Sequence, residues 1–160
     1  MAFKPTAYPE EKSLMYRLLK TQLIGLVDNV PHLTANLANA SALLNSALKD
    51  INWVGFYFLE KDTLILGPFQ GNPACVEIKV GNGVCGTAVA KDEIQLVKNV
   101  HEFPGHIACD SASNSEIVLP IHQNGNVIGV LDIDSPLLGR FDEEDQTGLA
   151  EIVKILEGMF

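Results

Sequence analysis

The stretch EIVLPIHQNGNVIGVLDID, residues 116–134, has the sequence pattern of a β-hairpin. Two runs rich in β-branched and aliphatic residues flank the pair Asn124-Gly125, which favours a tight turn between antiparallel strands. The pattern predicts that residues 116–121 and 126–134 are neighbouring antiparallel strands. The relative direction of these two strands follows from this prediction, and the other helices and strands are assigned before and after them.

The elements before and after the hairpin divide into helices and strands by their apolar periodicity. Helices are predicted over residues 10–26, along the stripe from Leu33 to Leu48, and over residues 141–159, whose acidic first turn suits the helix dipole. A short helix follows the glycine loop that starts at Gly81. Further strands are predicted at residues 51–60, 63–69, 75–80 and 93–100. This order indicates an α+β fold, not a parallel doubly wound one.

The bulk composition indicates a single domain over residues 1–160. Apolar residues make up 47% of the chain, which is enough for a core and too rich for disorder. The formal net charge of −9, without a basic run, argues against nucleic acid and anionic membranes as partners. The N-terminus has no apolar signal region, and no apolar run reaches the roughly 20 residues of a membrane span. We therefore expect a cytoplasmic protein.

The chain has three cysteines, Cys75, Cys85 and Cys109. An odd number without a signal sequence does not predict a disulfide scaffold, and cytosolic thiols stay reduced unless they are catalytic or redox-sensing. Cysteine is usually buried, yet Cys109 lies in a polar loop, residues 99–115, among histidine, aspartate and serines. Cys109 is therefore a candidate for chemistry.

Acidic side chains gather at the end of the hairpin. Asp132 and Asp134 alternate along one strand and project to the same face, after Ile128 and Val130. Two like charges on one face repel unless a ligand or a proton lies between them. Two alternatives stay open: an acidic site over an apolar-walled space, and a solvated strand end.

The orientation of Glu116 depends on the hairpin loop. A two-residue turn at Asn124-Gly125 would pair Glu116 with Ile133 and point it away from the aspartates. An odd-length loop, a β-bulge, or a place ahead of the regular strand would turn it to their side. A role for Glu116 in the same site requires one of these departures.

The stretch GNGVCG matches G-x-G-x-x-G at Gly81, Gly83 and Gly86. The helix that follows is too short for the βαβ unit of a dinucleotide site, and nothing else predicts a parallel sheet. A tight turn explains the glycines better. Cys85 lies within the motif, near a helix N-terminus, where a thiolate would be stabilised.

A zinc site is not favoured by the spacing of histidines and cysteines. The stretch HEFPGH, residues 101–106, resembles H-E-x-x-H but is one residue too long, and Pro104 prevents the required helix. The cysteines are ten and twenty-four residues apart, unlike the close pairs of structural zinc sites. The sequence therefore predicts no metal.

Trp53 and Tyr57 share one face of a predicted strand, with Gly55 between them. Two aromatic rings separated by a gap can wall a pocket for a small ligand. Such pairs belong more often to the core. Both interpretations stay open.

Acids beside a cysteine favour one kind of thiol chemistry. A neighbouring carboxylate raises the pKa of a thiol, and hydrolysis by a Cys–His pair would need a positioned histidine that nothing in the loop requires. A carboxylic acid can instead protonate the oxygen of a sulfoxide while the thiol attacks its sulfur. That step leaves a sulfenic acid, which Cys75 or Cys85 can convert to a disulfide for a dithiol to reduce.

Five stretches of the chain resemble one known family. They are NWVGFYF, LGPFQGNPAC, GNGVCGTA, FPGHIACDSASNSEIVLPI and GVLDIDS, and they lie within residues 52–135. Together they are similar to the free methionine-(R)-sulfoxide reductases built on a GAF domain. The resemblance implies an α+β fold with a central antiparallel sheet of about six strands. It also implies reduction of the free amino acid, not of methionine sulfoxide within proteins.

The resemblance implies roles for the three cysteines. Cys109 matches the nucleophile of the family, and Cys75 and Cys85 match its other cysteines, with Cys75 expected as the principal resolving residue. The family uses thioredoxin as reductant, and the preference for the R epimer rests on the resemblance alone. No cofactor is expected.

The resemblance also covers the acids and the aromatic residues. Glu116, Asp132 and Asp134 match the acids that bind the substrate and assist protonation at the sulfoxide. Trp53 matches the aromatic residue near the substrate methyl group, and Tyr57 is a weaker match. Since no arginine lies in these stretches, we expect backbone N–H groups of the loop 103–115 to bind the substrate carboxylate.

Two other functions remain as alternatives. A non-catalytic GAF domain that senses a small molecule is one, although an acidic pocket would repel phosphates. A zinc-binding structural module is the other. The sequence decides neither which of Cys75 and Cys85 resolves nor whether the chain forms a homodimer.

Overall fold

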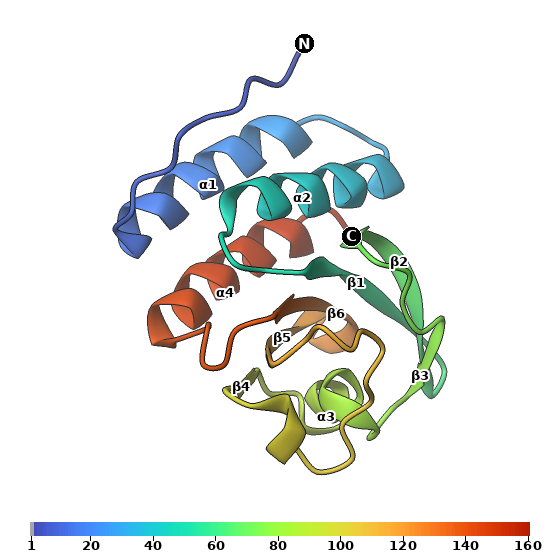
Figure 1. The fold of residues 1–160 in the computed structure, drawn as a ribbon. Coiled ribbons are helices and arrows are strands. Elements are labelled where there is room, and N and C mark those ends of the chain that lie inside the picture. Colours follow the sequence, from blue (N-terminus) through green and yellow to red (C-terminus); the bar gives the residue numbers. More distant parts are fainter. Residues whose placement is uncertain (1) are drawn as a thin grey trace.

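A six-stranded antiparallel sheet forms the centre of the protein (Figure 1), as seen in a computed structural model that describes residues 2–160. Its strand order is β3-β2-β1-β6-β5-β4. The strands are β1 (Trp53–Glu60), β2 (Thr63–Gly71), β3 (Glu77–Lys79), β4 (Gln95–Val97), β5 (Ser115–Gln123) and β6 (Asn126–Ser135). All five pairings are antiparallel, which confirms the predicted α+β architecture.

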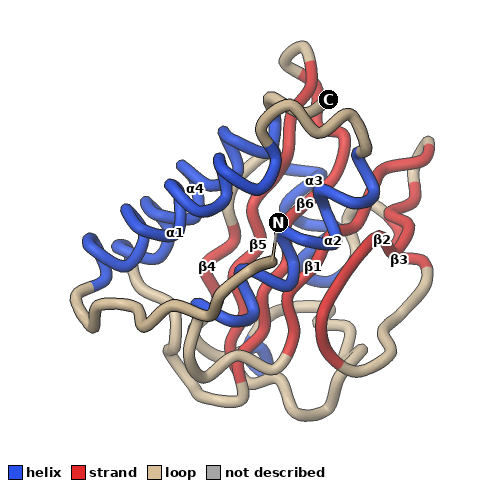
Figure 2. Tube along the Cα trace, turned by 90° about the horizontal axis from the view of Figure 1, so that it is seen from above, coloured by secondary structure: helices blue, strands red, loops and turns tan. Residues whose placement is uncertain are grey.

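Helices cover the two faces of the sheet unequally (Figures 1 and 2). Three helices pack on one face over the larger core: α1 (Lys12–Val27), α2 (Leu33–Ala47) and α4 (Glu143–Glu157). The short α3 (Gly83–Lys91) packs on the other face, and a 3-10 turn, η1 (Val100–Glu102), follows β4. Within residues 2–160, no helix has both the length and the apolar character to cross a membrane.

Side chains along β1 alternate between the two faces, as the sequence predicts. Val54 and Phe56 are buried in the core under α1, α2 and α4. Trp53 and Tyr57 are buried in the smaller cluster on the α3 side. Because the period of a strand is two residues, one strand contributes to both cores at once.

The two edge strands are shorter than the sequence predicts. The strand expected over residues 75–80 spans Glu77–Lys79, and the one expected over 93–100 spans Gln95–Val97. Each edge strand pairs with one neighbouring strand, so it has no hydrogen bonds on its other side that could lengthen it. Cys75 consequently lies just ahead of β3, outside the ladder.

The hairpin turn is the predicted two-residue turn. Asn124 and Gly125 both have positive φ angles, 52° and 79°, and Gln123 pairs with Asn126 across them. Positive φ at both central residues is the requirement of a type I′ turn. The turn alone would therefore point Glu116 away from the aspartates.

A β-bulge just beyond the turn changes the register by one residue. Ile121 pairs with Gly129, which leaves Ile128 as an extra residue in β6. The shift persists to the start of β5, where Glu116 lies opposite Asp134. Of the three departures that would place Glu116 on the face of the aspartates, the structure contains the bulge.

The end of α4 holds the bulge in place. The backbone N–H of His122, at the point of the register shift, donates to Oε2 of Glu157 at 2.5 Å, and its ring Nδ1 lies 3.1 Å from the same oxygen. The ring Nε2 lies 2.6 Å from Asp92, just after α3. A bulge disrupts the ladder locally, so an acceptor from outside the sheet stabilises it.

The start of α4 is anchored by a buried carboxylate. Asp142 and Asp145 form a capping box at the first turn. Asp145 is fully buried and accepts hydrogen bonds from the Tyr16 hydroxyl at 2.7 Å and from Lys12 at 2.6 Å. Partial burial opposes ionisation of Asp142, but the hydrogen bond from Lys12 holds its pKa at about 2. The acidic first turn is therefore stabilised by capping and ion pairs as well as by the helix dipole.

We expect Glu157→Ala to lower the free energy of unfolding by about 1–3 kcal/mol, because the N–H of His122 at the bulge loses its acceptor. Chemical denaturation at neutral pH measures the change. Glu151→Ala on the same helix removes an exposed ion pair with Lys20 and should cost less than about 1 kcal/mol. Equal losses in the two variants would contradict the role assigned to Glu157.

Candidate active site

The α3 face of the sheet holds a cavity with a free volume of about 40 Å³. It is lined by residues of β1, α3, β5 and β6 and of the polar loop between η1 and β5. Seven of the eight residues that the sequence singles out line it: Trp53, Tyr57, Cys85, Cys109, Glu116, Asp132 and Asp134. The eighth, Cys75, is bonded to Cys109. One cavity thus collects side chains that are far apart in the sequence.

Three adjacent strands bring the acids and the aromatic residues together. β6 lies between β1 and β5. Asp134 pairs with Trp53 on one side and with Glu116 on the other, while Asp132 pairs with Gly55. A side chain at Gly55 would collide with Phe69, since its Cβ would lie 2.3 Å from the Cβ of that residue. Residues directly opposite each other in antiparallel strands share a face, so this register places Glu116, Asp132 and Asp134 together on the cavity face.

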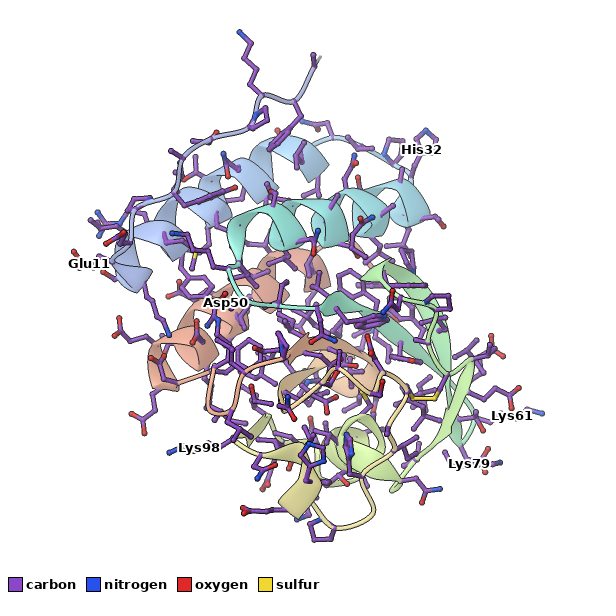
Figure 3. All side chains as sticks on the ribbon, in the orientation of Figure 1. Glu11, His32, Asp50, Lys61, Lys79 and Lys98 are labelled. Atoms are coloured by element: carbon purple, nitrogen blue, oxygen red, sulfur yellow. A yellow bond between two sulfur atoms is a disulfide. The ribbon has the colours of Figure 1, made fainter. Side chains whose placement is uncertain are left out.

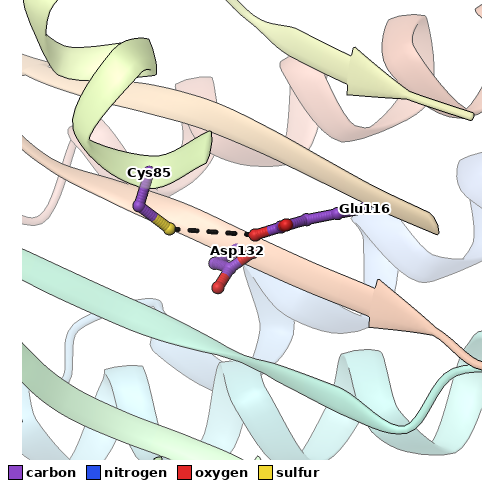
Figure 4. A group of neighbouring side chains, drawn as sticks. All are labelled: Cys85, Glu116 and Asp132. Carbon is purple, nitrogen blue, oxygen red and sulfur yellow. Dashed lines mark hydrogen bonds between the residues drawn. The ribbon is translucent and has the colours of Figure 1, made fainter. Parts of the chain in front are cut away.

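Glu116 and Asp132 are buried and Asp134 is partly buried, so the solvated strand end left open by the sequence is wrong. Glu116 and Asp132 are each 6% exposed, and one oxygen of each lies within 4.8 Å of the other and of Cys85 Sγ (Figure 4). Burial raises the pKa of Glu116 well above its usual range, and the charge of Asp132 adds to the effect. Burial likewise raises the pKa of Asp132 and of Asp134. The cluster therefore retains protons and can act as an acid.

One acceptor in this cluster has no donor. Among residues 2–160, Oδ1 of Asp132 is buried without a hydrogen-bond partner. A buried polar atom left unpaired costs about 1–3 kcal/mol. A ligand that donates a hydrogen bond, such as an ammonium group, would remove this cost. The geometry therefore favours a small ligand with a donor group at this point.

Cys85 differs from the stabilised thiolate that the sequence predicts. It lies in the first turn of α3, but it is only 4% exposed, and its Sγ is 4.0 Å from Oε1 of Glu116. Burial, and then the charge of Asp132, raises the pKa of the thiol well above its ordinary value. Desolvation and neighbouring acids outweigh the helix dipole, so Cys85 is a neutral thiol packed against the acids.

A disulfide joins Cys75 to Cys109, with their Cα atoms 5.4 Å apart (Figure 3). It connects the segment ahead of β3 to the polar loop, 34 positions later in the sequence. Both residues are partly exposed, in agreement with the expectation that Cys109 lies outside the core. The structure thus pairs Cys109 with the cysteine that the resemblance favours, and Cys85 stays free.

Stacked aromatic rings support one wall of the cavity. Trp53 stacks on Tyr57 and on Phe69, with ring centroids 5.9 and 5.1 Å away. Nε1 of Trp53 donates to the carbonyl of Asn72 at 3.2 Å, and the Tyr57 hydroxyl donates to the carbonyl of Cys75 at 2.8 Å. Because these polar groups are already paired, the rings present apolar surface to the cavity. The two residues are therefore part of the core and of the cavity wall at once, and their contact with a small ligand stays a prediction.

Asp110, which no predicted site included, anchors the loop that carries Cys109. Asp110 accepts a hydrogen bond from the N–H of Ala112 at 2.9 Å and another from the Asn52 side chain at 3.2 Å. Asn52 also donates to the hydroxyl of Ser113 at 3.1 Å, and it immediately precedes β1. An aspartate before small polar residues is typical of an Asx-turn, and this signal could have identified Asp110.

The geometry excludes the dinucleotide hypothesis. α3 connects two strands at opposite edges of an antiparallel sheet, so GNGVCG belongs to no βαβ unit. The N–H of Gly81 donates to the carbonyl of Gly86 at 2.9 Å, and a Cβ at Gly86 would lie 2.5 Å from the carbonyl oxygen of Lys79. The glycines therefore form the predicted tight turn.

The histidines and the cysteines do not come together as a zinc site. Within the described part of the chain, the donor cluster with metal-binding spacing is Cys85, Glu116 and Asp132, which contains no histidine. His101 instead lies 2.8 Å from the Asn114 side chain and edge-on to His106. The stretch 101–106 therefore contributes no ligand to that cluster.

Known proteins are similar to this chain in sequence and in fold. The family model for the GAF domain matches residues 38–157. A protein of Escherichia coli (strain K12) named free methionine-R-sulfoxide reductase is 56% identical over 146 residues, covering 91% of this chain and 88% of its own length. The free methionine-R-sulfoxide reductase of Neisseria meningitidis, solved in complex with its substrate, matches with a TM-score of 0.92 and 45% identity, covering 99% of this chain and 95% of that one. The fRMsr of Staphylococcus aureus, also with substrate, matches with a TM-score of 0.87 and 54% identity, covering 96% and 98%.

Glu116→Gln tests the buried acid through stability. Because the folded state raises the pKa of Glu116, it binds more protons than the unfolded chain above the ordinary value of 4.5. Stability should therefore fall as the pH rises from that value through the raised pKa. The neutral glutamine escapes this loss, so the variant should gain about 1 kcal/mol or more over the native chain at pH 8 compared with pH 4.

Denaturant unfolding at both pH values measures the difference. Glu93→Gln, at an exposed position, is the matched control and should show no pH-dependent gain. Parallel stability curves for the native chain and Glu116→Gln would show that the carboxyl group ionises freely in the cavity.

Proposed function

The chain belongs to the family of free methionine-R-sulfoxide reductases, which are built on a GAF domain, and we propose that it reduces free methionine-R-sulfoxide to methionine with Cys109 as the nucleophile. The observation that carries the proposal is the disulfide between Cys109 and Cys75 at a cavity that also holds buried acids. A small-molecule sensor would need neither the redox pair nor protonated carboxyl groups.

The first step transfers the sulfoxide oxygen to the enzyme. The thiolate of Cys109 attacks the sulfur of the substrate while a carboxylic acid protonates the sulfoxide oxygen. Glu116 suits this role because burial keeps it protonated. The protonated oxygen then passes from the substrate sulfur to the sulfur of Cys109: the substrate sulfur–oxygen bond and the new sulfur–sulfur bond break, methionine departs, and Cys109 is left as a sulfenic acid. The proton balances the charge, and the sulfur of Cys109 supplies the two electrons.

The second step forms the disulfide. The thiol of Cys75 attacks the sulfur of the sulfenic acid, the sulfur–oxygen bond breaks, and water leaves. The Cα separation of 5.4 Å places Cys75 within reach of Cys109. A dithiol then returns both cysteines to thiols, and thioredoxin in the cytoplasm is the reductant that we propose. Within this scheme residues 1–160 act as a single GAF domain.

The cavity has a complementary group for each part of the free amino acid. Asp132 and Asp134 accept hydrogen bonds from the ammonium group, which satisfies the unpaired oxygen of Asp132. The face of Trp53, with Tyr57 beside it, receives the methyl group. Backbone N–H groups of the loop 103–115, and those of the first turn of α3, receive the carboxylate. Peptide bonds would remove both charged ends, so this arrangement selects the free amino acid.

The disulfide form of the cavity is too small for the substrate. A free volume of about 40 Å³ has room for a few water molecules. Methionine sulfoxide therefore enters after the disulfide is reduced and the loop that carries Cys109 moves outward. In this scheme, the disulfide-bonded chain is the oxidised enzyme after methionine has left.

We expect Cys109→Ser to abolish methionine formation, because a serine hydroxyl is too weak a nucleophile to attack the sulfoxide. The assay incubates the protein with dithiothreitol and each epimer of free methionine sulfoxide, and chromatography quantifies methionine. The native protein should consume the R epimer alone. Native rates in Cys109→Ser would remove Cys109 from the mechanism.

Cys75→Ser should release about one methionine per chain and then stall when thioredoxin is the reductant, because the sulfenic acid lacks its partner. Rapid-quench measurement of the burst gives the number of turnovers. Cys85→Ser is the matched control: Cys85 lies outside the disulfide, so this variant should keep turning over. A stall in Cys85→Ser, with continued turnover in Cys75→Ser, would identify Cys85 as the resolving residue.

A further inference from the structure

The two segments that the disulfide joins are attached to the rest of the protein in different ways. On the Cys75 side, the Tyr57 hydroxyl donates to the carbonyl of Cys75 at 2.8 Å, and the N–H of Leu66 in β2 donates to the carbonyl of Val76 at 3.0 Å. These bonds attach the Cys75 segment to the sheet. Neither of these hydrogen bonds involves the sulfur of Cys75.

On the Cys109 side, the backbone hydrogen bonds of residues 104–109 stay within the loop. The N–H of His106 donates to the carbonyl of Phe103, and that of Cys109 donates to the carbonyl of Ile107. The links from this loop to the sheet begin at the next residue: Asn52 donates to the side chains of Asp110 and Ser113, and the N–H of Asn114 donates to the carbonyl of Ser135 in β6. Opening of the disulfide would therefore leave residues 104–109 without a hydrogen bond to the sheet, while the Cys75 segment keeps its own.

Both cysteines are partly exposed, but they differ in their position relative to the cavity. Cys109 lines the cavity, whereas Cys75 does not. The cavity has room for a few water molecules, so the cysteine of another protein cannot enter it to reach Cys109 from that side. Cys75 lies outside the cavity, next to Val76, whose side chain is 65% exposed.

We propose that a dithiol protein attacks the disulfide at Sγ of Cys75 and contacts Val76 as it does so, with Cys109 as the leaving thiolate. This inference rests on the proposed function, in which the disulfide is reduced in every cycle. The attacking thiolate bonds to Cys75, and the Cys75–Cys109 bond breaks. The second thiol of the partner then attacks its own sulfur in the mixed disulfide and releases Cys75. The partner loses two electrons and two protons, and the two cysteines gain them.

This order of events suits the next turnover. The mixed disulfide forms on the segment that the sheet holds fixed, so the partner stays in one place while its second thiol reacts. Cys109 is released first, and its loop becomes free to open the cavity for substrate. The exposed Val76 supplies apolar contact beside the attacked sulfur, and burial of an apolar side chain favours association.

A thioredoxin variant with serine in place of its second active-site cysteine tests the regiochemistry, because it cannot complete the exchange. The oxidised protein is mixed with this variant, quenched with N-ethylmaleimide and digested, and mass spectrometry locates the cross-link. We expect the cross-link at Cys75 and the maleimide label at Cys109. A cross-link at Cys109, or no cross-link, overturns the inference. The assay of methionine formation with dithiothreitol tests the proposed function separately, since dithiothreitol reduces the disulfide without a protein partner.

Steady-state kinetics test the contact at Val76. Val76→Asp should raise the KM for native thioredoxin about fivefold or more and leave the rate with dithiothreitol unchanged. Ile24→Asp is the matched control, because Ile24 is 51% exposed on α1 and the change in charge is the same. Its KM for thioredoxin should stay at the native value. An unchanged KM in Val76→Asp, or an equal rise in both variants, overturns the contact.

Discussion

The extra residue in β6 is the constraint on which the site depends. Side chains alternate along a strand, so a shift of one residue changes the face that each side chain occupies. With Ile128 bulged, Glu116 lies opposite Asp134 on the cavity face. Without the bulge, Glu116 would point toward the core under the three large helices. The carboxylate of Glu157 at the end of α4 accepts the N–H of His122 beside the bulge, so the helical layer helps to set the register of the site.

The acid cluster costs stability and supplies reactivity for the same physical reason. Burial of Glu116, Asp132 and Asp134 disfavours their charged forms, which raises their pKa values and keeps protons available to a sulfoxide oxygen. The chain tolerates this cost because the opposite face of the sheet carries a large apolar core under α1, α2 and α4. One face of the sheet therefore stabilises the fold, and the other carries the chemistry.

The three cysteines differ in role because their surroundings differ. Cys85 is buried against acids and stays a neutral thiol. The Cys75 segment is attached to the sheet through hydrogen bonds from β1 and β2, and Cys109 ends a loop segment, residues 104–109, whose backbone bonds stay within the loop. The disulfide joins these two segments. In the proposed cycle, the same bond closes the cavity after reaction and opens it on reduction.

The sequence by itself determined the features that depend on local period and turn chemistry. The hairpin at Asn124-Gly125, the antiparallel α+β order, and the shared face of Asp132 and Asp134 all follow from neighbouring residues, and family resemblance pointed to Cys109 and its partners. Only the tertiary structure decided the face of Glu116, the protonation of Cys85 and the anchoring of the Cys109 loop by Asp110. These depend on register, burial and contact between segments remote in the chain, which local sequence patterns do not specify.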